Sequence, residues 1–255
     1  MDPQPSPFEA LADKYDSWYD GKGRVAFEIE LAAVRPLLTE LPKPWLEVGV
    51  GTGRFAQALG IPLGIDPSPA LLEKARQRGI EVLYGEGEEL VFRAGSFGTV
   101  FLLTTWEFLN DPLRVLRECR RVLKADGRLV NAFLDRDGKW GASYVERGRH
   151  GHPLFSHAHF DTYEDVTRLT EQAGFDVLKT VSTLFQGPGQ TVAMEGARPG
   201  FVRGASFVVL VARVPANARP DRLLDNQLPR RRAAVGLEPE QVDPGRNRPN
   251  VQPEP

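Results

Sequence analysis

The chain has 255 residues, of which 41% are hydrophobic and 26% are charged. This length suits a single α/β domain with a tail and is sufficient to bury a sizeable core. The formal net charge of −2 at pH 7 gives no electrostatic reason to expect nucleic acid or an anionic membrane as the main partner. A small or neutral substrate fits this composition better.

Cysteine content and apolar segments favour a cytoplasmic location. The single cysteine, Cys119, has no second thiol with which to form an internal disulfide. The first residues lack the charged start and apolar run of a signal peptide. No apolar segment approaches the roughly 20 residues needed to span a bilayer. We therefore expect a soluble, cytoplasmic protein without a membrane partner, and its oligomeric state stays open.

The segment before the first strand is expected to begin loosely and then become ordered. Residues 1–7 contain three prolines and are expected to be disordered. Residues 8–20 concentrate aromatic and acidic side chains, which predicts a lid or a helix. Over 25–41 apolar residues recur at helical spacing, and Pro36 is expected to bend or shorten that helix.

Strands and helices then alternate. Each predicted strand is a short apolar run, and capping residues mark the helices. In chain order, the predictions are a strand at 45–48, a glycine loop at 49–53, a helix from Arg54, a strand at 62–66, a helix capped by Ser68 and ended by Gly79, strands at 80–84 and 99–105, a helix opened by Asp111, and a strand at 128–134.

The last third predicts an antiparallel strand pair. Residues 162–165 form a capping box before a helix that stops at Gly174. Two long strands, 175–185 and 206–214, follow without a helix between them, so they should pair antiparallel. The sequence thus predicts an α/β fold with a doubly wound, mostly parallel seven-stranded sheet, whose ligands bind at the carboxyl ends of the strands.

Beyond this predicted domain, at residues 8–214, the chain changes character. Residues 215–255 lack apolar periodicity, which predicts a mostly disordered tail. The three arginines at 230–232 are flanked by acids, and no aromatic side chain is interleaved with them. They are interpreted as part of a solvated linker rather than a nucleic-acid-binding segment.

The loop after the first strand carries the main functional signal. Gly49, Gly51 and Gly53 let the main chain approach a ligand without intervening side chains. The dinucleotide fingerprint places its third glycine one residue later. Glu47 would repel a diphosphate but would fix an ammonium group. The loop favours an amino-acid-bearing cofactor over a dinucleotide, and a tight turn without a ligand is the alternative.

Acidic residues after the next two strands extend this site. Asp66 follows Glu47 at close to the roughly 20-residue offset at which an acid meets ribose hydroxyls in such folds. Its alternative role is to cap the following helix. Glu86 and Gly87 follow the third strand and are expected to border an adenine, although alone they describe an ordinary acidic surface turn.

Four ordered segments, LEVGVGTGRFA, GIDPSPALLEKARQRG, GEGEELVFRAGSFGTVFLLTT and NDPLRVLRECRRVLKADGRLV, resemble the class I S-adenosylmethionine-dependent methyltransferases of the type 11 methyltransferase-domain group. The resemblance covers about residues 8–214 and implies a Rossmann-like methyltransferase fold with S-adenosylmethionine as cofactor. It implies the following contacts: Glu47, Gly49, Gly51 and Gly53 with the methionine part, Asp66 with the ribose, Glu86 and Gly87 with the adenine, and Thr104 and Thr105 with the edge nearest the sulfonium. Val91 and Gly87 depart from the usual proline and alanine, which puts the exact shape of that loop in doubt.

The aromatic segment 15–19 resembles one that many of these enzymes fold over the cofactor. Tyr15 or Tyr19 would donate a hydrogen bond to the methionine carboxylate, and the rings would face the sulfonium. The alternative is an amphipathic helix packed on the sheet.

Candidate substrate contacts surround the expected position of the methyl group. All four histidines lie between 150 and 159, in a loop that is interpreted first as solvated or pocket-lining, second as a source of a base, and third as a metal site. Trp106 follows the fourth strand, and packing under the next helix is its alternative role. The substrate candidates are Tyr19, Trp106, Tyr144, His157 and His159. No metal is predicted, because the implied chemistry needs none.

The leading functional hypothesis is methyl transfer to an oxygen, nitrogen or sulfur atom of a small molecule. Such transfer depends mainly on positioning, and a general base is required only if the acceptor must lose a proton, so no catalytic residue is assigned. The alternatives are a non-catalytic protein that binds S-adenosylmethionine or S-adenosylhomocysteine as a regulator or partner, and a nucleotide-dependent oxidoreductase.

Overall fold

The computed structural model describes residues 8–215. The chain divides into units 1–221 and 222–255, and the second unit lies entirely outside the described residues. The expectations of a loose segment at 1–7 and of a disordered tail to residue 255 likewise fall on residues outside the described part, except for residue 215.

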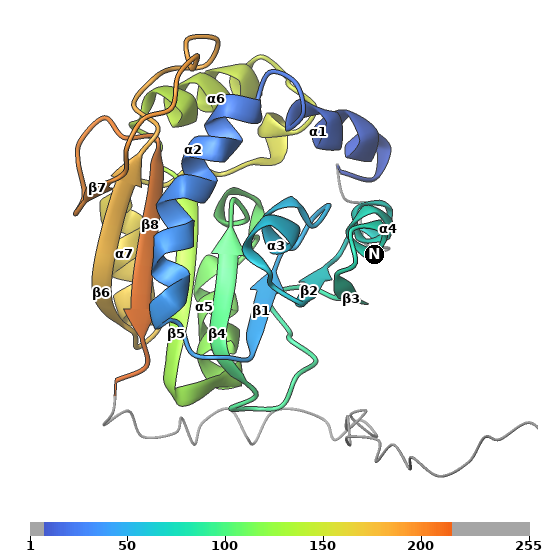
Figure 1. Ribbon diagram of the computed structural model, residues 1–255, viewed down its shortest axis with the longest axis vertical. Helices are drawn as coiled ribbons and strands as arrows, with labels where there is room; N and C mark the ends of the chain where they lie inside the picture. The colour runs from blue at the N-terminus through green and yellow to red at the C-terminus, as the bar shows by residue number, and fades with distance from the viewer. Residues whose placement is uncertain (1–7, 216–255) are drawn as a thin grey trace, which may run out of the picture. The chain divides into compact units, whose positions relative to one another are not determined.

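One sheet runs through the domain in the order β3-β2-β1-β4-β5-β8-β6-β7 (Figure 1). Its strands are β1 (Trp45–Val48), β2 (Leu63–Asp66), β3 (Glu81–Tyr84), β4 (Phe97–Leu103), β5 (Leu123–Leu134), β6 (Asp176–Thr183), β7 (Arg198–Pro199) and β8 (Phe207–Arg213). The first five are mutually parallel, whereas β8 is antiparallel to both β5 and β6. This confirms the mostly parallel sheet with a late antiparallel pair.

The strand count differs from the expected seven because β7 adds a short eighth strand among the described residues. Val181 and Ser182 of β6 pair with it antiparallel. The hydroxyl of Ser182 also donates a hydrogen bond to the carbonyl oxygen of Gly200 at 2.8 Å, which fastens the returning segment. An Arg-Pro dipeptide shows no strand periodicity, and proline is tolerated at a sheet edge, so nothing in the pattern predicts this strand.

Helices cover both faces of the sheet. They are α1 (Ala12–Trp18), α2 (Arg24–Val34), α3 (Arg54–Leu59), α4 (Pro69–Gln77), α5 (Pro112–Val122), α6 (Lys139–Arg149) and α7 (Tyr163–Gln172), with 3-10 turns η1 (Glu9–Leu11), η2 (Arg35–Glu40), η3 (Trp106–Phe108) and η4 (Phe155–His157). None of the helices within residues 8–215 is long and apolar enough to cross a membrane.

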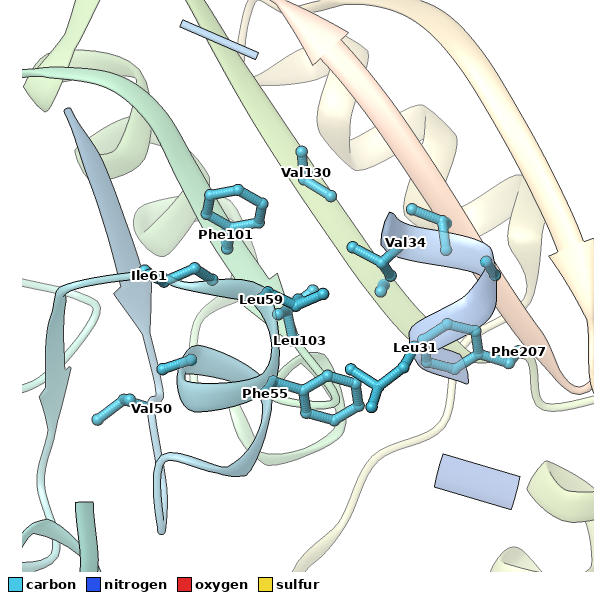
Figure 2. Close-up of a cluster of buried hydrophobic side chains, with 14 of the residues drawn as sticks. Leu31, Val34, Val50, Phe55, Leu59, Ile61, Phe101, Leu103, Val130 and Phe207 are labelled. Atoms are coloured by element: carbon cyan, nitrogen blue, oxygen red, sulfur yellow. The ribbon is translucent and has the colours of Figure 1, made fainter. Parts of the chain in front are cut away.

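Two buried clusters hold these layers together. One joins α2, α3, α4 and α6 to the sheet, and Figure 2 shows part of it between α2 and α3. The other packs α5 and α7 against the opposite face. Strand β4 is buried along its whole length, with Phe101 and Leu103 in the first cluster and Val100 and Leu102 in the second. It is the central, doubly covered strand that its sequence predicts.

The predicted helix starts are confirmed at three positions. The side chains of Ser68, Asp111 and Thr162 accept hydrogen bonds from backbone N–H groups in the first turns of α4, α5 and α7. Such caps satisfy backbone donors that a helix leaves without partners. Helix α2 ends at Val34 and continues as the 3-10 turn η2, which contains Pro36.

Helix α6 has no counterpart among the predicted elements. It contains Gly141 and Gly148, and glycine disfavours a helix interior by roughly 1 kcal/mol relative to alanine. Packing explains both glycines. A Cβ atom on Gly141 would lie 2.1 Å from the carbonyl oxygen of Asp135, and one on Gly148 would lie 2.4 Å from that of Phe155. The glycines that weaken the helical signal are therefore the ones that let the helix dock.

Candidate active site

The loop between β1 and α3 turns at glycines with positive φ. The φ angles are +74° at Gly49, +53° at Gly51 and +78° at Gly53. A Cβ atom on Gly49 would lie 2.2 Å from the side chain of Thr105, whereas one on Gly51 would have no heavy atom within 4 Å. The loop thus packs closely against the end of β4 at Gly49 and faces open space at Gly51.

Glu47 presents a buried carboxyl group next to this loop. Its side chain is 1% exposed, and its Oε2 atom has no hydrogen-bond partner within the described residues. Burial, together with the nearby Asp66, raises the pKa of Glu47 well above its usual range. A buried polar atom without a partner is unusual in a folded protein and fits a site for a ligand N–H group. The residues present therefore fit a cofactor that carries an ammonium group.

A small cavity of about 30 Å³ lies at the same place. Its lining comes from β1, the glycine loop, the start of α3, the end of β4, and helix α1 with the residue after it. The lining residues are Tyr15, Tyr19, Glu47, Gly49, Val50, Gly51, Thr52, Arg54, Phe55, Leu103 and Thr104. Five of the ten predicted cofactor contacts thus border one space: Tyr15, Glu47, Gly49, Gly51 and Thr104.

Asp66 ends β2 beside the loop and links it to α4. Its two carboxyl oxygens accept hydrogen bonds from the N–H groups of Gly51 and Ser68, both at 2.9 Å. Burial raises the pKa of Asp66 to about 6, although these two hydrogen bonds act in the opposite direction. The cap of α4 is the Ser68 hydroxyl. Asp66 does not line the small cavity, and its contact with a ribose stays a prediction.

Glu86 and Gly87 lie in the turn after β3, outside the lining of the small cavity. Glu86 is exposed. A Cβ atom on Gly87 would lie 3.1 Å from Val48 and 3.2 Å from Val115, which is a tight contact with the core. Their contact with an adenine also stays a prediction.

The N-terminal aromatic segment forms η1 and α1, in agreement with the predicted helix. Asp16 holds α1 through ion pairs of 2.9 Å with Arg54 of α3 and 2.7 Å with Arg78, just after α4. The hydroxyl groups of Tyr15 and Tyr19 are hydrogen bonded at 2.8 Å, with either as donor. Both tyrosines thus reach the glycine loop from a helix that is fixed at its polar side.

A second cavity, of about 400 Å³, adjoins the first. Tyr15, Tyr19 and Thr104 line both cavities, so the two spaces meet at these side chains. Thr104 has a φ of +52°, a strained conformation for a β-branched residue, and such strain clusters at functional sites. The remaining aromatic lining consists of Trp18, Phe108, Trp140, Tyr144, Phe155 and Phe160. We call this space the aromatic cavity.

Two of the five predicted substrate contacts, Tyr19 and Tyr144, line the aromatic cavity. The ring of Tyr144 stacks on Phe155 with centroids 3.9 Å apart. Trp106 does not line it, which corrects the expectation that this residue walls the substrate. It is 1% exposed in the core cluster of α5 and α7, and its indole N–H donates a hydrogen bond to Asp161 at 3.0 Å.

The histidine loop agrees with its first interpretation, as solvated or pocket-lining, but its two substrate candidates require a correction. His157, which ends η4, and His159 are both exposed and do not line the aromatic cavity. His152 lines it instead, stacked on Phe155 with centroids 4.4 Å apart. Burial, and then the charge of Arg147, lower the pKa of His152. The described residues contain no group of three or more side chains arranged to hold a metal ion.

Two buried carboxyl groups in the aromatic cavity escaped the sequence analysis. Glu30 of α2 is 5% exposed, and burial followed by the charge of Glu107 raises its pKa to about 8. Glu107 is 2% exposed, and burial raises its pKa to about 7. A signal for Glu30 was present: it shares a helical face with Ala26, Ile29 and Ala33, all buried, and a carboxyl on an apolar face is unusual.

Comparisons with known proteins identify the family to which the chain belongs. Residues 46–131 match the family model of a methyltransferase domain. A solved structure from Thermotoga maritima, a SAM-dependent methyltransferase named as a possible histamine N-methyltransferase, is 36% identical, covers 82% of this chain and 99% of its own, and gives a TM-score of 0.76. An uncharacterized protein of Mycobacterium tuberculosis is 41% identical over 203 residues, which are 79% of this chain and 71% of the relative. A ubiquinone biosynthesis O-methyltransferase of Salmonella paratyphi A is 29% identical over 218 residues, with 72% of this chain and 88% of the relative covered. The glycine loop, the unpartnered Glu47 and these relatives together place the chain in the S-adenosylmethionine-dependent methyltransferases, with S-adenosylmethionine as its cofactor.

Proposed function

We propose that this protein transfers the methyl group of S-adenosylmethionine to an oxygen, nitrogen or sulfur atom of a small molecule bound in the aromatic cavity. The observation that carries the proposal is the junction of the two cavities at Tyr15, Tyr19 and Thr104. A volume of about 400 Å³ lies within the range of roughly 300–1,000 Å³ found for small-molecule pockets.

Cofactor binding is assigned to the residues around the glycine loop. Glu47 accepts a hydrogen bond from the ammonium group through its free oxygen, and the glycines bring main chain against the methionine part. Asp66 is assigned to the ribose, and Glu86 with Gly87 to the adenine. When bound, the cofactor supplies an electrophilic methyl group on a positively charged sulfur.

The contribution of the chain to the reaction is chiefly positioning. Aromatic walls exclude water from the acceptor and fix its orientation, and such positioning supplies much of the rate in a transfer between two bound molecules. Two relatives support a small acceptor, since one is a ubiquinone biosynthesis O-methyltransferase and another is named as a possible histamine N-methyltransferase. Their acceptor atoms differ, so the relatives leave the atom open.

Calorimetry on the full chain with S-adenosylmethionine and S-adenosylhomocysteine tests the cofactor site. We expect micromolar binding of both and a loss of more than about tenfold in Gly51→Val, because the valine side chain would enter the open space at the loop. Gly60→Val is the matched control: its φ is +73° and an added Cβ atom also meets nothing within 4 Å, but Gly60 lies outside both cavities. Equal binding by the two variants would refute the assignment.

Methyl transfer itself is tested with radiolabelled cofactor and a panel of phenols, thiols and amines. We expect label to enter at least one class of small molecule. Tight cofactor binding without transfer to any class would instead support the non-catalytic role, in which the protein senses the cofactor.

A further inference from the structure

The aromatic cavity contains two acidic groups that the proposed methyl transfer does not use. Glu30 and Glu107 both line it and are 5% and 2% exposed. Within residues 8–215 no group hydrogen bonds to the side chain of Glu30. Glu107 accepts one hydrogen bond, from the N–H group of Leu134 at 2.6 Å. An unpartnered carboxyl group that is 95% buried points to a ligand that would pair with it.

The other charged groups of this cavity are solvent-exposed. Lys14, Lys22 and Arg147 belong to its lining, but all three are exposed, and none pairs with either glutamate in the described part of the chain. The guanidinium of Arg147 lies over the rings of Tyr144 and Phe155, at 5.5 Å and 4.9 Å from their centroids. The inner wall is therefore acidic and aromatic, whereas the basic groups face water.

The remaining titratable groups of the wall do not neutralise the two glutamates. The pKa values of Tyr15, Tyr19 and Tyr144 are raised by burial, so their hydroxyl groups stay neutral at pH 7. Burial lowers the pKa of His152, which favours its neutral form. Apart from the exposed Lys14, Lys22 and Arg147, the described lining contains no cation to offset a charge on Glu30.

The lining of the aromatic cavity favours one class of methyl acceptor. A buried carboxylate is stable when it is paired with a cation, and the faces of aromatic rings also attract cations. An anionic acceptor would find no cation on the inner wall to pair with, and a neutral hydroxyl group would give only a weaker hydrogen bond. We propose that the aromatic cavity binds an acceptor that carries a basic nitrogen, and that Glu30 and Glu107 hold this nitrogen as its cationic form. The inference rests on the proposed function, because it specifies the substrate class of the same site.

A pair of probes that differ in one group tests this inference without turnover. The full chain is saturated with S-adenosylhomocysteine and titrated with 2-phenylethylamine, a cation, or with 2-phenylethanol, its neutral isostere. We expect the amine to bind about tenfold or more tightly than the alcohol, as a charge-assisted hydrogen bond predicts. We also expect the amine alone to release a proton at pH 7, seen as a buffer-dependent heat, because pairing converts neutral Glu30 or Glu107 to its carboxylate form.

Two variants on α2 supply the controls. Glu30→Gln removes the charge, so the preference for the amine should fall below about threefold and proton release should diminish. Glu28→Gln, an exposed position on the same helix, should retain both. Circular dichroism and unchanged affinity for S-adenosylhomocysteine show that each variant is folded.

The possible results separate the two proposals. Failure of the wild-type protein to bind S-adenosylhomocysteine would count against the proposed function. If S-adenosylhomocysteine binds normally, three results would overturn only the inference about the basic nitrogen. These results are that the alcohol binds as tightly as the amine, that neither probe binds at millimolar concentration, or that Glu30→Gln keeps the preference for the amine.

Discussion

At the scale of single residues, Gly49 is the position where backbone conformation and space both restrict the side chain. Gly49→Ala should destabilise the fold by about 2–4 kcal/mol, because left-handed φ costs an alanine roughly 1–2 kcal/mol and the overlap with Thr105 costs roughly as much again. Gly60→Ala carries a similar φ in open space and should show only the first cost. Urea denaturation of the two variants measures the difference, and equal midpoints would contradict the close contact.

Single residues of the site differ in how well the sequence predicts where they lie. The glycines and Glu47 were predictable because their spacing after a buried strand reflects backbone geometry, which is local. Trp106 and His159 were misplaced because side-chain direction depends on packing: Trp106 points under α5 and α7, and His159 points to solvent. Glu30 was missed because its place on a buried face of α2 does not reveal which cavity that face borders, which depends on tertiary packing.

At the scale of elements, local signals and tertiary contacts contributed differently. The strands and the caps of α4, α5 and α7 follow short-range patterns and were predicted. Helix α6 was not, because its glycines are explained only by contacts with Asp135 and Phe155. The two-residue β7 was missed for a similar reason, since pairing with β6 alone defines it.

Helix α1 gives the prediction at this scale. Asp16 joins it to Arg54 and Arg78, and the three side chains are only 14–18% exposed, so their charge-assisted hydrogen bonds should hold α1 in place. Asp16→Asn should lower the opening free energy of residues 12–18 by roughly 1–3 kcal/mol. Hydrogen exchange of this segment should then accelerate by about fivefold or more.

Asp20 supplies the comparison for this experiment. It also pairs with Arg54, at 2.5 Å, but its side chain is 70% exposed. Exposed pairs contribute little, so Asp20→Asn should change exchange of the same amides only slightly. Similar acceleration in both variants would mean that partial burial of Asp16 does not strengthen the attachment of α1.

At the scale of the whole molecule, buried carboxyl groups couple the site to stability. Burial raises the pKa to about 8 for Glu30, about 7 for Glu107 and about 6 for Asp66. The folded state therefore keeps protons that the unfolded chain has already released, so stability falls as the pH rises from about 4.5 to about 8.

Asp16 acts in the opposite sense. Burial would raise its pKa, but hydrogen bonds from Arg54 and Arg78 lower it below its usual range, so its contribution is lost as the pH falls below about 3.8.

These opposing contributions predict maximum stability near pH 4, with a decline toward pH 8 as the site carboxyls ionise without partners. Glu30→Gln should reduce that decline, by up to about 5 kcal/mol at pH 8, because the amide has no charge to bury. The exposed Glu28→Gln should follow the wild-type curve. Saturating S-adenosylhomocysteine should also flatten the decline, because its ammonium group gives Glu47 a cationic partner. Urea midpoints between pH 4 and pH 9 measure the two variants and the wild-type protein with and without S-adenosylhomocysteine. A wild-type midpoint that stays constant from pH 5 to pH 8 would show that burial of these carboxyls does not govern stability.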